Sequence, residues 1–447
     1  MAQVHPGLSY DLLVQVLEIL RDDYATLYQC ALVNSQLNQA ASRFLYARVE
    51  YSPPYRPVLD LKDRGTLPES SMFASACNPR YAHLVIELKI TGFLSVRPPP
   101  LNMLSDTIAN AIRMFTNLSN VTLCPTTYHE HLFLASLEAL QDCAHLCELA
   151  VNPSCMNDVT TPALSSLTGL RRLTLSSPGR TILNVLPDWL SRISRSLVGL
   201  HLEDNCGSIT PGVLTSFVPH IQDNLQELTL GLSYSLADEN VFFFLNQLPH
   251  LQRLQLQYYW AQQQLRPPTT HPRLSKLKYF AVDYSVIESR FEAINLCKWI
   301  RKVISSSPIE HIRLICDDFY KFPANVSFDS IVDHIVKKHS RTLLILDLGS
   351  AYIGVDSFRQ LLSSCFKLEE MHVAVRKNAL DIFEELSPRM EQLHTVSFDI
   401  RNCKRKKCRV EFERAAKMIT QGPPSLRRLM INGDKWEVVQ SLIVLTS

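Results

Sequence analysis

The chain has 447 residues, of which 46% are hydrophobic and 20% charged, with a formal net charge of +2. This composition allows a large buried core and excludes global disorder. The near-neutral charge gives no reason to expect a nucleic acid or an anionic membrane as a partner. No apolar run approaches the roughly 18 residues of a membrane span.

The N-terminus also bears on where the chain works. Asp11 and Glu18 interrupt its apolar stretch and no basic segment precedes it, so it does not resemble a signal peptide. We therefore expect a cytoplasmic protein, a nuclear protein, or both. In such a compartment the twelve cysteines would be reduced, with several inside repeats acting as small buried hydrophobes.

Residues 1–50 hold two helical patterns and no copy of the repeat found later in the chain. Apolar residues recur at helical spacing in both. The first pattern comprises Leu8, Leu12, Leu13, Val16, Leu17 and Leu20, and the second runs from Leu27 through Val33 and Leu37 to Leu45. The sequence therefore predicts a small all-α module at the N-terminus.

This module resembles an F-box, the helical docking module of cullin-type ubiquitin ligases. The family pattern opens with Leu-Pro-x-Glu-Leu-Leu and continues with an Ile-Leu pair, a central leucine and a Val-x-x-x-Trp step. Ser9 replaces the usual proline and Leu37 the usual tryptophan, and the ending FLYARVEY resembles the exit of fungal F-box proteins. The matching positions are Leu8, Asp11, Leu12, Leu13, Val16, Leu17, Leu27 and Val33.

The resemblance implies a specific partner surface. A Skp1-like adaptor, and through it a cullin, would dock on Leu8, Leu12, Leu13, Leu17, Leu27 and Val33. The alternative is that residues 1–50 only cap the open end of the domain that follows, because repeat domains need such caps.

Residues 51–80 connect the module to that domain. The first part contains Pro53, Pro54, Pro57 and Pro68, which favours a stiff, extended linker; an ordinary loop packed on the first repeat is the alternative. The segment 70–90, SSMFASACNPRYAHLVIELKI, resembles the one that follows the F-box in many fungal leucine-rich-repeat F-box proteins. There, an entry helix, an Asn-Pro-Arg turn and a first strand begin the repeats.

Residues 81–447 are dominated by one repeated pattern. The hexapeptide L-x-x-L-x-L, with aliphatic substitutes, occurs thirteen times between Val85 and Ile431, with starts 24 to 34 residues apart. This spacing brackets the period of leucine-rich repeats. Each copy reads as a short strand, because its last apolar positions alternate, and amphipathic helical segments follow the strands.

The segment after Leu202 illustrates the helical part, with Thr210 as cap, Pro211 in the first turn and an apolar stripe through Leu214 and Phe217. Stacked units bury what single units cannot. We therefore predict an α/β solenoid of about thirteen irregular repeats, with a curved parallel sheet on the concave face and helices on the convex face. A doubly wound fold would need less regular spacing and longer strands.

A ligand surface is predicted on the concave face. The third and fifth residues of each hexapeptide point there, and aromatic and arginine side chains are the usual anchors of protein interfaces. Tyr258 and Tyr284 are also expected just past the strand ends. Alternatively, Trp260 and one tyrosine pack under the insertion Ala261–Ser275. The predicted substrate-binding residues are Arg253, Tyr259, Trp260, Tyr279 and Arg313.

The sequence contains no catalytic or cofactor motif such as a phosphate loop or a nucleophile elbow. His129, Glu130 and His131, followed by Cys143 and Cys147, lack zinc-ligand spacing, so we expect them to be structural. Cys403 and Cys408 flank the basic run Lys404–Lys407, which fits a solvated loop; redox or metal chemistry and nuclear import are the alternatives.

These observations predict a non-enzymatic substrate-recognition subunit of an SCF-type ubiquitin ligase, with an unknown protein substrate and no cofactor or metal. The main alternative is a leucine-rich-repeat scaffold without a ligase role. An enzyme site on the solenoid is the third possibility.

Overall fold

The computed structural model describes residues 8–53, 71–94, 101–127, 129–259, 271–316, 326–401, 410–439 and 442–446. They fall into two compact units, Met1–Ser208 and Ile209–Ser447. Most of the proline-rich linker, most of the insertion after Trp260, and the basic run Lys404–Lys407 lie outside the described residues.

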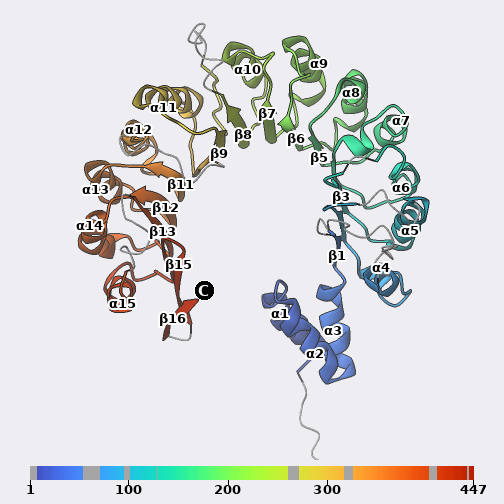
Figure 1. Cartoon of the computed structure of the whole chain (residues 1–447), viewed down its shortest axis with the longest axis horizontal. Coiled ribbons are helices and arrows are strands. Elements are labelled where there is room, and N and C mark those ends of the chain that lie inside the picture. The colour runs from blue at the N-terminus through green and yellow to red at the C-terminus, as the bar shows by residue number, and fades with distance from the viewer. Residues whose placement is uncertain are drawn as a thin grey trace, which may run out of the picture. The chain divides into compact units, whose positions relative to one another are not determined.

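The first unit begins with three helices and continues as a parallel sheet, β1 to β6, in which every strand pairs with the next. In Figure 1 the helices that follow β1 lie on one side of the strands, and the three N-terminal helices lie past the end of the sheet. Its elements are α1 (Tyr10–Ile19), α2 (Tyr24–Val33), α3 (Ser35–Leu45), β1 (Arg48–Tyr51), α4 (Ser71–Ala76), η1 (Ala82–Leu84), β2 (Glu87–Ile90), α5 (Leu101–Met114), β3 (Asn120–Leu123), α6 (Leu134–Leu140), β4 (Glu148–Val151), η2 (Pro153–Cys155), α7 (Thr161–Ser165), β5 (Arg172–Ser176), α8 (Arg180–Ile193) and β6 (Gly199–Asn205).

The second unit repeats this arrangement with strands β7 to β14 in parallel and ends in an antiparallel hairpin. Its elements are α9 (Pro211–Ile221), β7 (Glu227–Leu232), α10 (Asp238–Leu245), β8 (Arg253–Tyr258), β9 (Tyr279–Tyr284), α11 (Arg290–Ile304), β10 (His311–Ile315), α12 (Asp329–His339), β11 (Ile345–Tyr352), α13 (Val355–Ser364), β12 (Glu370–Val375), α14 (Ala379–Leu386), η4 (Ser387–Arg389), β13 (Thr395–Ile400), α15 (Phe412–Gln421), β14 (Arg428–Ile431), β15 (Asp434–Val439) and β16 (Leu442–Thr446).

The thirteen hexapeptides coincide with the thirteen strands β2 to β14, which confirms the predicted leucine-rich-repeat solenoid. The fourth residue of each hexapeptide forms a buried ladder across the sheet. In the second unit it runs Leu228, Leu254, Phe280, Ile312, Leu346, Met371, Val396 and Leu429, all at most 2% exposed. Each such side chain contributes about 1.5–3 kcal/mol by burial.

The helices covering the ladder form where the sequence predicts them. Thr210 caps α9, its hydroxyl accepting a hydrogen bond from the Val213 amide at 3.4 Å, and Pro211 occupies the first turn. Leu214 and Phe217 are buried on the face toward the sheet. The α9 sequence therefore determines both where the helix starts and which face it buries.

Two parts of the sheet were not predicted. Strand β1 begins at Arg48, inside the segment assigned to the helical module, and pairs in parallel with β2. The sheet therefore starts at Arg48 and not at residue 81. Within β1 the buried Val49 stands between more exposed polar neighbours, which is the pattern of a strand. At the other end, β15 and β16 close the sheet as a hairpin, with Trp436 opposite Leu429.

Candidate functional site

The helical module, α1 to α3, is built by side-chain caps at each helix start. Ser9 accepts from the Leu12 amide at 3.4 Å, Asp23 from the Thr26 amide at 3.0 Å, and Asn34 from the Leu37 amide at 2.8 Å. Ser9, which stands where the F-box pattern has proline, therefore has a local role of its own. Such caps are worth about 1 kcal/mol each.

The module has its own small core, and this corrects part of the predicted adaptor surface. Leu17 is 2% exposed and Leu27 is fully buried, packed with Ala31, Ala40 and Ala41. These two leucines hold the module together and are not available to a partner in this conformation. Leu13 and Leu37 are partly buried against the same core.

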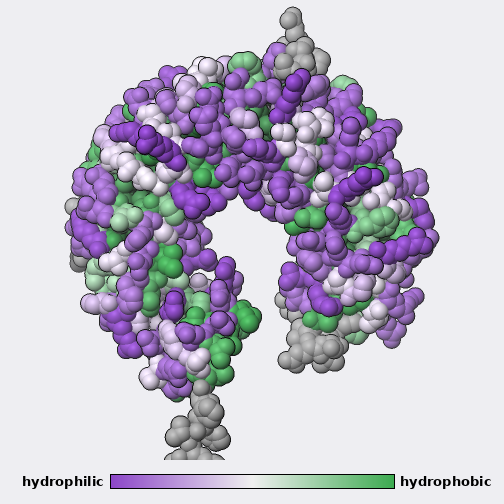
Figure 2. Space-filling view, turned by 180° about the vertical axis from the view of Figure 1, so that it is seen from behind, coloured by the Kyte–Doolittle hydropathy of each residue, from purple (hydrophilic) through white to green (hydrophobic). Residues whose placement is uncertain are grey.

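The opposite faces of α1 and α2 expose apolar side chains at helical spacing. Of the sixteen large hydrophobic side chains exposed among the described residues, eight lie between residues 8 and 33. They are Leu8, Leu12, Val16, Ile19, Tyr24, Tyr28, Leu32 and Val33. Figure 2 shows apolar side chains gathered on this module, at the lower left of centre. A concentration of this kind marks an interaction surface; we call these eight residues the apolar face.

A second candidate surface is the helix-free face of the sheet in the second unit, which we call the open face. Arg253, Tyr279 and His311 stand opposite one another on β8, β9 and β10. The Arg253 guanidinium carbon lies 4.2 Å from the centre of the Tyr279 ring, and the Tyr279 and His311 rings are 6.1 Å apart. This is a cation–π contact extended by an edge-to-face ring pair.

The next row of the open face is a chain of charged groups. Arg313 Nε lies 3.3 Å from Asp347 Oδ2, and Asp347 Oδ1 lies 2.9 Å from His372 Nδ1. His372 Nε2 is in turn 3.3 Å from Asp399 Oδ2. Four adjacent strands, β10 to β13, thus contribute an arginine followed by an acid–histidine–acid arrangement.

Burial and neighbouring charges shift the pKa values of His372 and Asp347. Burial lowers the pKa of His372, but hydrogen bonds to Asp347 and Asp399 and their negative charges outweigh it and raise the pKa to about 9. Burial likewise raises the pKa of the Asp347 carboxyl, while the His372 hydrogen bond and charge, the Gly349 amide and the Arg313 charge lower it more. At neutral pH His372 is therefore protonated and Asp347 ionised.

A bulge in β11 orients Asp347. The register between β11 and β12 shifts after Asp347, and Gly349 adopts a positive φ of 51°. The Gly349 amide donates to Asp347 Oδ1 at 3.0 Å, and a Cβ on Gly349 would lie 2.9 Å from the Leu314 carbonyl oxygen. Only glycine fits this backbone without strain.

The predicted substrate residues do not form a single patch. Arg253, Tyr279 and Arg313 lie on neighbouring strands near the strand starts, but Arg313 is already paired with Asp347. Tyr259 follows the end of β8, about 20 Å along the strand direction from Arg253. It is partly buried and packs edge-to-face on Tyr234 at 5.5 Å between ring centres. Trp260 lies outside the described residues.

The prediction that two further tyrosines lie just past the strand ends was wrong. Tyr258 and Tyr284 are 3% and 4% exposed because they occupy inward positions of β8 and β9, against Trp299 and Phe328. Sequence reasoning also missed Asp347, His372 and Asp399. Their hexapeptide positions, in LLILDL and LEEMHV and just past LHTVSF, are outward-facing and titratable, and this was the available signal.

In the first histidine–cysteine motif, His129 makes structural contacts, whereas Cys403 and Cys408 lie outside the described residues. His129 is 4% exposed, and its Nε2 lies 3.0 Å from the Leu94 carbonyl and 3.1 Å from the Thr127 hydroxyl. Within the described ranges no cluster of three or more histidine, cysteine or acidic residues could hold a metal ion. The ten cysteines there are free thiols, and no helix there is long and apolar enough to cross a membrane.

Comparison with known proteins gives distant likenesses only. No family model matches the chain, and no curated protein matches it. The Rad7 and Elc1 complex in yeast aligns at 14% identity over 95% of this chain and 92% of that chain, with a TM-score of 0.48. The leucine-rich repeat-containing protein LegL7 from Legionella pneumophila aligns at 13% over 86% and 92%, with a TM-score of 0.34. Likenesses this distant transfer no activity or partner to this chain.

Proposed function

We propose that this chain is the substrate-recognition subunit of an SCF-type, cullin-based ubiquitin ligase. The apolar face of the helical module carries the proposal, because half of the exposed large hydrophobic side chains described are concentrated there. In this proposal the module docks a Skp1-like adaptor, and the open face holds a protein substrate. Other subunits transfer ubiquitin, so the chain itself contributes no catalytic step and works in the cytoplasm or the nucleus.

The division between core and surface in the module supports a docking role. Leu17 and Leu27 supply the core, so the exposed residues of the apolar face are not needed to fold the helices. Leu12 and Val16 are 48% and 50% exposed on one face of α1, and Val33 is 67% exposed at the end of α2. A few such apolar side chains, desolvated together, supply most of the energy of a protein interface.

The test replaces exposed apolar residues by charge. Leu12→Asp with Val33→Asp should weaken adaptor binding at least a hundredfold, because a buried charge costs several kcal/mol. The helical content and thermal unfolding of the chain should not change. Phe366→Asp is the matched control, since Phe366 is 50% exposed but lies outside the module. Unchanged co-purification of the adaptor with the double variant would refute the ligase assignment.

A leucine-rich-repeat scaffold without a ligase role is the second candidate, and the junction of the module with the sheet favours it. The Tyr46 and Tyr81 rings stack 4.3 Å apart, and the Tyr46 hydroxyl lies 2.6 Å from the Ser75 hydroxyl. Together with β1, these contacts make the module a cap on the first repeat. If the module is only a cap, its removal aggregates the chain and no adaptor binds the intact protein.

A further inference from the structure

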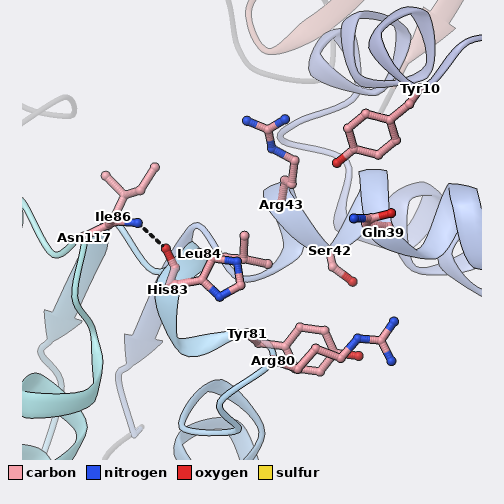
Figure 3. A pocket seen from close by; sticks show the side chains of 10 residues that line it. All are labelled: Tyr10, Gln39, Ser42, Arg43, Arg80, Tyr81, His83, Leu84, Ile86 and Asn117. Carbon is pink, nitrogen blue, oxygen red and sulfur yellow. Dashed lines mark hydrogen bonds between the residues drawn. The ribbon is translucent and has the colours of Figure 1, made fainter.

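A cavity of about 830 Å³ lies in the first unit, between the helical module and the start of the repeats. Tyr10 and Arg43 reach it from α1 and α3, and Arg80 and His83 from the segment between α4 and β2 (Figure 3). Its volume falls within the range of sites that hold metabolite-sized ligands, about 300–1,000 Å³.

The lining is rich in hydrogen-bond donors and contains no carboxylate. Its polar members are Tyr10, Gln39, Ser42, Arg43, Arg80, Tyr81, His83 and Asn117. In the part of the chain that the structure describes, no carboxylate lies within ion-pair distance of Arg43 or Arg80. The strand face of the same unit behaves differently, because Arg48 pairs with Glu87 at 2.7 Å and Lys89 with Glu50 at 3.2 Å.

The Asn-Pro-Arg step of the sequence fixes one wall of the cavity. Asn78 Oδ1 accepts from the Arg80 amide at 2.9 Å, and the Asn78 carbonyl accepts from the Tyr81 amide at 2.8 Å. The Arg80 guanidinium then lies over the Tyr81 ring, 5.5 Å from its centre. The Tyr81 ring also stacks on the Tyr46 ring. Arg80 Nη2 also donates to Asn38 Oδ1 at 3.5 Å, and the other N–H groups of the guanidinium are left for an anion.

The remaining walls are also held in place. Asn117 Nδ2 donates to the His83 carbonyl at 2.6 Å, which ties the loop before β3 to the segment before β2 (Figure 3). Ser42 is 4% exposed, and its carbonyl accepts from the Tyr46 amide at 3.0 Å. The donors are therefore mounted on a framework that does not need the ligand in order to form.

We propose that this cavity binds a small, multiply phosphorylated molecule. Arg43 and Arg80 come from different segments, so each can take a separate phosphate group, and arginine matches phosphate geometry through paired N–H donors. The apolar walls, Leu84 and Ile86, suit the organic part of such a ligand. Because the site joins α1 and α3 to the first repeat, an occupied cavity locks the module onto the solenoid. This inference does not depend on the ligase proposal.

The experiment uses the purified full-length chain with sodium tripolyphosphate as probe, at physiological salt. Calorimetric titration should show saturable binding at one site, and the probe should raise the melting temperature and slow hydrogen exchange in α1. Arg43→Gln with Arg80→Gln should weaken binding at least tenfold. Arg113→Gln with Arg192→Gln is the matched control, since both arginines are exposed on helices of the same unit, and it should bind normally.

Three results would overturn the inference. The first is the absence of saturable binding by a folded wild-type chain, and the second is equal weakening in the two double variants. The third is binding of an unphosphorylated polyglutamate peptide, but not tripolyphosphate, in a manner that requires Arg43 and Arg80. Adaptor binding is measured on the same variants. Loss of adaptor by Arg43→Gln with Arg80→Gln, without any effect of the probe, would assign the cavity to the adaptor interface and leave the ligase proposal standing.

Discussion

The helical module and the open face of the second unit are two surfaces with opposite chemistry. The module leaves apolar side chains such as Leu12, Ile19 and Val33 in water without a partner. On the open face, Arg313, Asp347 and His372 already satisfy one another within the chain. Covering an exposed apolar surface with a complementary partner lowers the free energy of the system. A polar row whose groups are already paired must instead exchange those contacts for contacts with the ligand.

The difference indicates which surface supplies affinity and which supplies selectivity. Apolar burial is non-directional and adds up with area, so the module suits a constant, tightly held partner. A polar row rejects ligands that leave its charges unpaired, because each buried, unpaired charge costs several kcal/mol. Under the proposed function, the open face therefore suits discrimination among substrates.

The largest expected effect separates the two sides of the module. Leu17→Ala should lower the free energy of unfolding of the module by about 2–5 kcal/mol, since it empties a core position. Leu12→Ala should change it by less than about 0.5 kcal/mol, since Leu12 is on the surface. Hydrogen exchange of the α1–α3 amides measures both. Equal losses would mean that the apolar face is part of the module's own core.

The second prediction concerns the bulge that positions Asp347. Gly349→Ala places a Cβ at a positive φ and against the Leu314 carbonyl, so it should destabilise the second unit by about 1–3 kcal/mol. Gly354→Ala is the control, because Gly354 has no positive φ and the atoms nearest its Cβ would belong to the Asp329 side chain and not to the backbone. Denaturant unfolding measures the free energy of unfolding of both variants. Equal values would mean that the bulge tolerates alanine at residue 349.

The third prediction is a pH dependence of the charged row. The pKa of His372 is raised to about 9 from its ordinary value near 6.5, so its stabilising contribution is fully present below about pH 6.5 and is lost as pH rises through 9. His372→Gln should therefore melt lower than wild type at pH 6, and the gap should narrow by pH 9.5. His334 and His339, whose pKa burial lowers to about 4, stay neutral over this range. A melting-temperature difference that stays the same from pH 6 to pH 9.5 would contradict the raised pKa of His372.

The smallest expected effect concerns the cation–π pair. Arg253→Ala should cost about 0.5–1 kcal/mol of stability, because the contact is exposed. Under the proposed function, the same change should weaken substrate capture and leave adaptor binding unchanged. Tyr259→Ala should act independently of Arg253→Ala in a double-mutant cycle, because the two residues lie at opposite ends of β8. A large coupling free energy between the two substitutions would support the single patch predicted from the sequence.

The repeat architecture from β2 to β14 could be predicted from the sequence, because each of these strands coincides with one hexapeptide whose apolar residues alternate. The helical module and the cap of α9, Thr210, were also predicted, since both are local patterns.

The division of the module's leucines into core and surface could be seen only in the folded structure. A helix with apolar residues on several faces does not show from its sequence which face its neighbours cover. The folded structure likewise shows that Asp347, His372 and Asp399 meet, since they are brought together by strand register across separate repeats. The cavity beside Arg43 and Arg80 arises for the same reason, because side chains distant in sequence converge only once the module has packed against the first repeat.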